Sequence, residues 1–471
     1  MPQTKLIRPA YSESFRCIAS ECEDTCCRGW NVPVESAACE RFKILPAGPL
    51  HALIDASLEL TPKGPADKSG LGLEGFAKFR MTASNQCPML TEGRLCRIQA
   101  EAGEEFLPHA CATYPRIVRS IGGAREISLA LSCPEAARLV LLDPDLLGPA
   151  EQAAVQMEDA DSGEGASWLP PYFWAIRETA LKLVRNRTYP LWQRLFLLGT
   201  LCRRLDAVAQ GEVQRDAASV LADFEAVVAL GTLRAEMETL PADPAGHMDV
   251  LLRLAGLMLH RSNVRPRFVE CVNAFTTGIG NVPGVTMEIL TTGYRLAYES
   301  HFVPFFELHP YILENYLINT IFRCQFPFGS EGMKEGATPS MTREFATLTA
   351  QYALMKGLLV GVAGFHGEAF SNEHVVHTVQ SASKHFDHHP EFLNLAYELL
   401  VESRMDDARG LTILLRDAEP KPASAAAMPA SPGTQAQGSQ VERQASTPDR
   451  LEATDPSLPV PPLHAHGARQ R

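Results

Sequence analysis

The sequence predicts a mainly α-helical protein in three parts: a loop-rich, cysteine-rich metal-binding domain over residues 1–145, an α-helical domain over residues 165–416 and a disordered tail over residues 417–471. Three observations predict this organisation. Cysteines gather in the first part, apolar residues recur with helical spacing in the second, and Pro, Ala, Ser and Gln dominate the third. A chain of 471 residues is long enough to bury a large core and to form two or three domains.

The charge and the N-terminus restrict the partners and the compartment. The chain has 43 Lys and Arg against 55 Asp and Glu, a net charge of −12, which argues against general electrostatic binding to nucleic acid or to an anionic membrane. Its start, MPQTKLIRPAYSESF, has no apolar signal region, and no later stretch reaches about 18 uncharged apolar residues. We therefore expect a cytoplasmic protein whose cysteines stay reduced.

The first part is defined by eight clustered cysteines in two groups of four: Cys17, Cys22, Cys26 and Cys27, then Cys87, Cys96, Cys111 and Cys133. Between the groups, the stretch from Leu60 to Gly75 is rich in Pro, Gly and Lys and predicts a solvated loop. We expect this loop to bring the two groups together. The remaining cysteines are more isolated and are interpreted as small buried hydrophobic residues: Cys39, Cys202, Cys271 and Cys324.

Clustered thiolates are soft ligands that suit an iron-sulfur cluster or tetrahedral zinc, and Gly- and Pro-rich loops let several sulfurs converge. Zinc sites usually show two C-x2-C pairs or a Cys/His pairing, and the first part contains no C-x2-C. The spacing therefore favours iron-sulfur over zinc. Because one cluster needs only four thiolates, the eight cysteines leave open which four bind it and whether the others hold a second metal or pack in the core.

The second part shows amphipathic runs and no alternation of apolar strands with helices, so we expect packed helices and no large parallel sheet. The clearest runs are Tyr172 to Val184, Leu191 to Ala209, Met248 to Leu259, Tyr311 to Phe322 and Phe392 to Leu400.

The third part has nine prolines from Pro420 onward and almost no large apolar residues. Such a composition cannot offset the entropy of ordering, so the tail is predicted to be disordered.

Two sets of stretches form a recognisable pattern. In the first part they are YSESFRCIASECEDTCCRGWNV, CPML, LCRIQAEAGEEFLPHACATYPR and LSCPEAARLVL; in the second they are PYFWAIRETALKLVRNRTYPLWQRLFLLG, ENYLINTIFRCQFPFG and HTVQSASKHF. Together these stretches resemble the flagellin lysine-N-methylase family. The first part is also similar to a broader cysteine-rich iron- and zinc-chelating domain pattern. The resemblance covers nearly everything except the tail. It implies methyl transfer from S-adenosylmethionine to surface lysines of flagellin, the protein of the bacterial flagellum, with a 4Fe-4S cluster required for activity.

The binding site of the methyl donor is not predicted by a motif. The chain has no G-x-G-x-x-G, and the nearest stretch, Gly278-Ile-Gly280, is interpreted as a turn. A C-x3-C-x2-C triad, typical of radical cofactor chemistry, is also missing, because Cys22-x3-Cys26 continues directly into Cys27. Polar and radical mechanisms both remain open.

Methylation of lysine requires a neutral ε-amine, although an unperturbed lysine has a pKa near 10.4. Glu23, Asp24 and Tyr114 lie among the cysteine motifs and are candidate bases. Acidic residues are more often solvated, so none of the three is assigned a catalytic role.

Five histidines crowd one helical segment, and two of them could face the same way as metal ligands do. No carboxylate motif accompanies them, so they are interpreted as ordinary helix residues: His374, His377, His385, His388 and His389.

The alternative to a methyltransferase is a metal-binding or electron-transfer protein whose helices serve only for partner contact. An assay separates the two, because methyl transfer requires both flagellin and the methyl donor.

Overall fold

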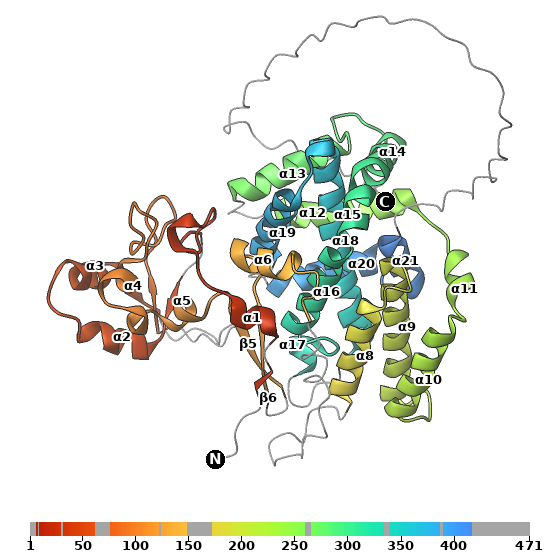
Figure 1. The fold of residues 1–471 in the computed structure, drawn as a ribbon, viewed down its shortest axis with the longest axis horizontal. Helices are drawn as coiled ribbons and strands as arrows, with labels where there is room; N and C mark the ends of the chain where they lie inside the picture. The colour runs from red at the N-terminus through yellow and green to blue at the C-terminus, as the bar shows by residue number, and fades with distance from the viewer. Residues whose placement is uncertain are drawn as a thin grey trace, which may run out of the picture.

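The computed structural model describes residues 6–7, 9–29, 32–61, 76–121, 124–147, 172–259, 265–333, 339–386 and 390–416. Within these ranges the chain is mainly helical, as predicted, with the cysteine-rich region beside a larger bundle of helices (Figure 1). The predicted tail and almost all of the predicted loop between the cysteine groups lie outside the described residues. The division into domains at residues 145 and 165 stays a prediction.

The N-terminal region is built from short elements joined by irregular chain, which confirms the loop-rich character predicted for it. The longest of its helices, α3, has nine residues. In chain order the elements are β1 (Leu6–Ile7), α1 (Ala10–Ser14), η1 (Ala19–Glu21), β2 (Pro33–Val34), α2 (Ser36–Lys43), α3 (Pro49–Ser57), β3 (Leu58–Leu60), β4 (Ala77–Phe79), α4 (Arg97–Glu101), η2 (Glu104–Phe106), α5 (His109–Thr113), β5 (Arg116–Ile121), β6 (Ala124–Leu129) and α6 (Pro134–Leu141).

Two small sheets that no sequence pattern predicted lie within this region. The first has the order β1-β6-β5: β5 and β6 are antiparallel, with Arg116 opposite Leu129, and β1 runs parallel to β6. The second has the order β2-β4-β3 and is antiparallel throughout. Each sheet has three strands. The expectation of no large parallel sheet concerned the second part, where the described residues form helices.

The second region consists of helices, and the five predicted amphipathic runs are confirmed in α8, α9, α12, α16 and α20, except that Tyr172 precedes α8. The elements are α8 (Phe173–Arg185), α9 (Leu191–Ala209), α10 (Ala217–Leu230), α11 (Arg234–Glu238), α12 (Pro244–Leu259), α13 (Pro266–Gly278), α14 (Met287–Ala297), the π-helix η3 (Tyr298–Phe302), α15 (Val303–Leu308), α16 (Tyr311–Arg323), α17 (Gly329–Gly332), α18 (Met341–His366), η4 (Gly367–Ala369), α19 (Asn372–Phe386), α20 (Pro390–Glu402) and α21 (Ala408–Leu415).

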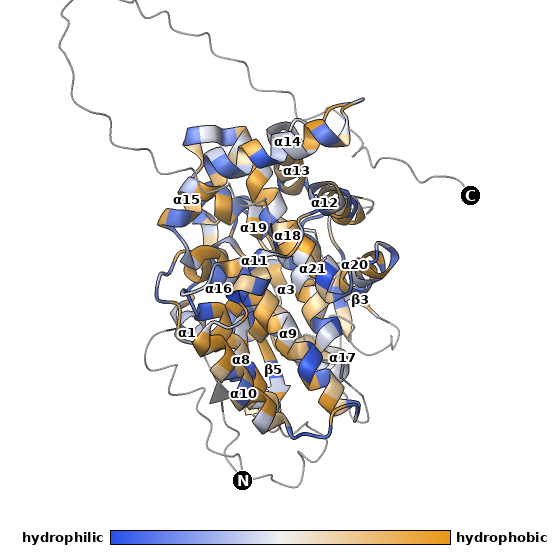
Figure 2. Cartoon of the chain, turned by 90° about the vertical axis from the view of Figure 1, so that its right-hand side faces the viewer, coloured by the Kyte–Doolittle hydropathy of each residue, from blue (hydrophilic) through white to orange (hydrophobic). Residues whose placement is uncertain are grey.

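Helix α18 forms the centre of this bundle, and Figure 2 shows it running through the middle of the surrounding helices. It is buried on all sides along most of its length, which explains why its apolar residues show no single stripe. The stretch Met341–Ala369 is long and apolar enough to cross a membrane, but 89% of its most apolar window is buried inside the protein. A central core helix has the same composition.

The first turn of α18 is fixed by side chains that accept hydrogen bonds from otherwise unpaired backbone N–H groups. Ser340 accepts from the amide of Arg343, and the buried Asp206 of α9 accepts from the amides of Met341 and Thr342 at 2.9 and 2.8 Å. These bonds supply the partners that the start of a helix lacks.

The described residues form two hydrophobic cores of different size. The large core fills the helical bundle and also takes in Tyr11, Phe15 and Leu129 from the N-terminal region. The small core lies between residues 32 and 107, around Phe42, Ile54 and Phe79. The first sheet and α6 therefore pack with the bundle, whereas the second sheet and its helices form a separate unit.

Buried polar contacts fix the first sheet on the bundle. Arg177 of α8 forms an ion pair with Glu126 of β6 at 2.9 Å, and both side chains are almost fully buried. Asn319 of α16 donates a hydrogen bond to the carbonyl of Leu129 at 2.9 Å and accepts one from the hydroxyl of Tyr11 at 3.1 Å. Because unpaired buried groups are costly, these pairs specify one docking position.

Candidate metal centre

All eight predicted cysteines line one cavity of about 400 Å³ in the N-terminal region. The two groups, far apart in the sequence, are thus brought together as expected. Phe15, Val32, Phe79 and Met89 form apolar parts of the wall, so the cavity combines sulfur donors with a water-excluding surface. None of the four isolated cysteines lines it: Cys39, Cys202 and Cys271 are buried elsewhere, and Cys324 is partly buried after α16.

The first cysteine group lies on an irregular segment that other loops hold in place. The amide of Cys87 donates to the carbonyl of Cys27 at 2.8 Å, and the amide of Gly29 donates to the carbonyl of Asn85 at 3.0 Å. The guanidinium of Arg94 also donates to the carbonyl of Cys22. The two cysteine segments are therefore joined through their backbones, which brings their sulfurs to the same space.

In the second group, Cys96 immediately precedes α4 and Cys133 immediately precedes α6. Burial raises the pKa of both thiols, to about 11 for Cys133, while backbone amides of the following helix turn donate to each sulfur and act in the opposite direction. Such amides stabilise a thiolate once it forms.

The thiols differ in how easily they ionise. Burial raises the pKa of Cys87 to about 12 and raises that of Cys111 well above its usual range, and a neighbouring thiolate at Cys27 raises both further. The pKa of Cys27 is lowered to about 7, because the thiol of Cys26 donates a hydrogen bond to it and because Thr25 and Lys384 add to the effect.

Several buried thiolates cannot coexist in this space without positive charge, since each one disfavours ionisation of the next. The donor set therefore fits a cationic, thiophilic group. Among the described residues, no group of three or more His, Cys, Asp or Glu is arranged so that it could hold a single metal ion. In a cluster the thiolates bind different iron atoms, so they are spread more widely than around one ion.

The helical bundle contributes to this site through α19. Lys384 donates to Oδ2 of Asp24 at 2.5 Å, and Gln380 donates to the same oxygen at 2.7 Å and to the carbonyl of Ser132 at 3.0 Å. Asp24 lies between Cys22 and Cys26. Two α19 side chains thus hold a cysteine-bearing segment from the far end of the chain.

A second contact from the bundle comes from Arg265, whose guanidinium donates to the carbonyl of Gly29 at 2.9 Å. Gly29 has φ +77, and a Cβ there would lie 2.6 Å from the Arg265 side chain. Only glycine suits both the left-handed backbone and this close approach.

The three candidate bases, Glu23, Asp24 and Tyr114, have other partners. Glu23 pairs with Arg138. Burial opposes ionisation of Asp24, but the charge of Lys384 and the hydrogen bonds from Lys384 and Gln380 outweigh it and lower its pKa. Burial raises the pKa of Tyr114 well above its usual range, and its hydroxyl lies 3.0 Å from that of Ser132. Asp24 is held ionised by Lys384, and Tyr114 stays protonated. Neither is therefore suited to accept a proton from an amine at neutral pH.

The glycine stretch and the histidines that the sequence singled out pack against or pair with other protein groups. Gly278 packs against the backbone of α18, where a Cβ would lie 1.8 Å from the carbonyl oxygen of Gly361. His374 accepts a hydrogen bond from the amide of Ser371, and the ring of His385 packs on Phe268. His377 lies 3.7 Å from Glu270, while His388 and His389 fall outside the described residues.

Residues 177 to 414 match the family model described as the FliB lysine N-methylase C-terminal domain. The matched residues make up half of the chain. The chain therefore belongs to the lysine N-methylase family, a class of enzymes that methylate protein lysines. The cysteine cavity lies outside the matched residues.

Two relatives agree with this family. The chain is 23% identical to the Lysine-N-methylase of Salmonella typhimurium over 299 residues, which cover 61% of this chain and 70% of the relative. It is 28% identical to the Flagellar biosynthetic protein FliU of Salmonella muenchen over 152 residues, which cover 32% of this chain and 86% of the relative. No solved structure matches the chain.

Gln380 and Lys384 were not identified as site residues from the sequence. The one signal was their presence in the family-like stretch HTVQSASKHF, in which the structure buries both residues.

Proposed function

We propose that the chain transfers methyl groups from S-adenosylmethionine to surface lysines of flagellin, and that the cysteine cavity holds an iron-sulfur cluster, a 4Fe-4S cluster, on which this activity depends. The observation that supports the cluster most strongly is the convergence of eight thiols on one cavity. The names of the relatives support lysine methylation and a flagellar substrate.

The cavity supports a cluster better than zinc. Zinc takes four donors at about 2.0–2.3 Å around one point, whereas the thiols here are spread around a cavity of about 400 Å³. When bound, such a cluster supplies thiolate-ligated iron that can exchange electrons and that joins the surrounding loops. Cys17, Cys22, Cys26, Cys27, Cys87, Cys96, Cys111 and Cys133 are the residues from which its ligands would come.

In the polar route, the neutral ε-amine of the target lysine attacks the methyl carbon of the sulfonium. The N–C bond forms as the C–S bond breaks, the electron pair of that bond stays on sulfur, and the new ammonium releases a proton to solvent or to a base. The helical bundle would bind the protein substrate and orient the amine, since extended contacts provide binding energy for positioning. The rate should rise with pH while the target amine loses its proton.

We place this activity in the cytoplasm. All twelve cysteines are free thiols, and unpaired thiols persist in a reducing compartment. The net charge of −12 supports a protein partner over nucleic acid or an anionic membrane.

Mass spectrometry tests the proposal. Anaerobically purified protein should add one or more methyl groups to lysines of flagellin from the same organism when S-adenosylmethionine is present, and it should not methylate free lysine. The matched variants are Cys26→Ala, which removes a cavity thiol and should abolish methylation, and Cys202→Ala, which removes a core thiol and should preserve it.

Unmodified flagellin in the presence of fully loaded protein and donor would favour a metal-binding or electron-transfer protein without methyl-transfer activity.

A further inference from the structure

A second concave site lies on the helical bundle between α9 and α10, with α11 at one end. We call it the α9–α10 groove; its volume is about 840 Å³. Figure 1 shows α9, α10 and α11 on the side of the bundle opposite the cysteine-rich region. The groove is therefore separate from the candidate metal centre.

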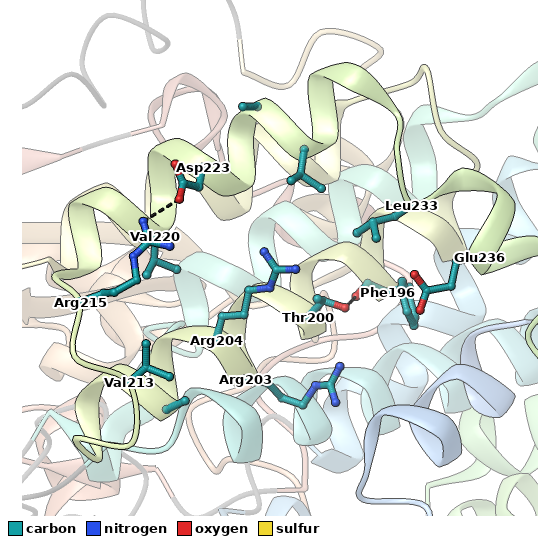
Figure 3. Close-up of a pocket in the computed structure, with 13 residues that line it drawn as sticks. Phe196, Thr200, Arg203, Arg204, Val213, Arg215, Val220, Asp223, Leu233 and Glu236 are labelled. Atoms are coloured by element: carbon teal, nitrogen blue, oxygen red, sulfur yellow. Dashed lines mark hydrogen bonds and ion pairs between the residues drawn. The ribbon is translucent and has the colours of Figure 1, made fainter.

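The groove has apolar walls and a basic centre. Figure 3 shows Arg203 and Arg204 in its middle, Val213 and Val220 toward one end, and Phe196 and Leu233 toward the other. Val213 is 40% exposed, so apolar surface is available to a partner. α10 has 14 residues and is about 21 Å long, a length that suits several turns of a docked helix.

The charges of the groove are not balanced internally. Arg215 pairs with Asp223 at 2.6 Å, but in the described part of the chain no carboxylate forms an ion pair with Arg203 or Arg204. Arg204 lies over the ring of Phe224 at 5.3 Å, and its charge stays exposed to the groove. Two guanidinium groups that form no ion pair with any described residue, in a protein of net charge −12, provide a local site for carboxylates.

The mixture of arginines and apolar side chains that lines the groove favours a peptide over a nucleic acid as partner. A nucleic acid could pair phosphates with the arginines, but it would leave the valines and Leu233 without apolar contact. A peptide helix with carboxylates between aliphatic residues matches both the arginines and the apolar walls.

We propose that the α9–α10 groove binds an acidic amphipathic helical segment of the protein substrate, with carboxylates paired to Arg203 and Arg204 and aliphatic side chains against Val213, Val220 and Leu233. This inference rests on the proposed function, because it takes the partner to be the methylated protein. The groove holds the substrate at a distance from the cysteine cavity, so binding and methyl transfer can be measured separately.

The test measures binding of flagellin to the metal-loaded protein without S-adenosylmethionine. The double variant Arg203→Ala/Arg204→Ala should raise Kd by about fivefold at low salt, as expected for two exposed ion pairs, and the difference should shrink at high salt. Arg295→Ala, which removes an exposed arginine of α14, should leave Kd unchanged. The single variant Arg203→Ala leaves the contact of Arg204 with Phe224 intact, so a rise in Kd in this variant cannot come from loss of that contact.

A photocrosslinking amino acid at position 213 should attach to an acidic helical segment of flagellin. An unchanged Kd in the double variant, an equal rise in Arg295→Ala, or single-stranded DNA bound through the same arginines without any effect on flagellin would overturn the inference. Normal flagellin binding through the groove without methyl transfer would instead contradict the proposed function alone.

Discussion

The cysteine-rich region and the helical bundle differ in what stabilises them. The bundle has a continuous core around α18, whereas the cysteine-rich region has a small core, short elements and a cavity lined by thiols. A small unit buries too little apolar surface to be stable alone, and a bound metal can supply the missing free energy. One chain thus combines a region that folds through packing with a region whose stability we expect to depend on the proposed metal.

Removing cavity thiols should give the largest effect and should act on one region only. In Cys26→Ala and Cys96→Ala, we expect loss of the visible cluster absorption and of bound iron, with faster proteolysis between residues 9 and 121. Cys202→Ala, in the core of α9, should retain the absorption and iron of the unaltered protein. Unchanged iron in both cavity variants would show that neither residue is a ligand.

The stability of the bundle should depend instead on how closely its helices pack. Gly278→Ala places a Cβ 1.8 Å from the Gly361 carbonyl oxygen, so α13 and α18 must separate, and we expect a loss of about 3 kcal/mol in the free energy of unfolding. Gly256→Ala is the matched control in α12, because its Cβ would meet nothing within 4 Å; it should stabilise the bundle by about 0.5–1 kcal/mol. Urea unfolding measures both. Equal effects of the two substitutions would contradict close packing of α13 on α18.

The contact between the regions should have an intermediate effect. Lys384→Met leaves Asp24 without its closest cation, and we expect a loss of about 2 kcal/mol in the free energy of unfolding. Glu178→Gln, which removes the partner of the exposed Lys182, should change the free energy of unfolding by less than about 0.5 kcal/mol. A loss in Lys384→Met no larger than that control would show that α19 does not hold the cysteine segment.

The same contact predicts a dependence on acid. The pKa of Asp24 is below its ordinary value of 3.8 in the folded protein, so the unfolded chain binds more protons at low pH. The stability that Asp24 supplies is therefore complete above pH 3.8 and is lost as the pH falls through its folded-state pKa. In Asp24→Asn, the free energy of unfolding measured with urea should fall less steeply with decreasing pH, because the contribution of Asp24 is missing.

His377 should give the smallest effect. Burial, with the nearby Arg267, lowers its pKa from 6.5 to about 4. The unfolded chain binds the proton more readily between these values, so stability should rise with pH from about 4 to 6.5 and then level off. NMR titration of His377 measures the pKa, and His377→Gln should flatten the rise. A midpoint near 6.5 would contradict the burial of this ring.

Much of the helical fold could be predicted because local spacing determines it. The run Leu191–Ala209 was predicted with the same bounds that α9 has, since its apolar residues repeat with the helical period. The sheets were missed because their strands are short and do not alternate simply. β6 buries Glu126, a charged residue, and only its distant partner Arg177 makes that possible. Gly122-Gly123, directly after the β-branched residues Ile117, Val118 and Ile121, was the sequence signal for a hairpin.

The convergence of the cysteine groups could be predicted because clustered thiols point to one chemistry. The support from α19 could not, because Gln380 and Lys384 are 356 and 360 residues away from Asp24 in the sequence. No local pattern indicates which distant side chains will pack together. The arginines of the α9–α10 groove were missed for a similar reason, since they appear in the sequence as the polar face of an ordinary helix.

Iron, acid-labile sulfide and zinc analysis of anaerobically purified protein tests most directly whether the cysteine-rich region is built around a cluster. We expect roughly four iron and four sulfide per chain, with both reduced to background in Cys26→Ala and retained in Cys202→Ala. One equivalent of zinc per chain without sulfide would contradict the assignment of the cavity.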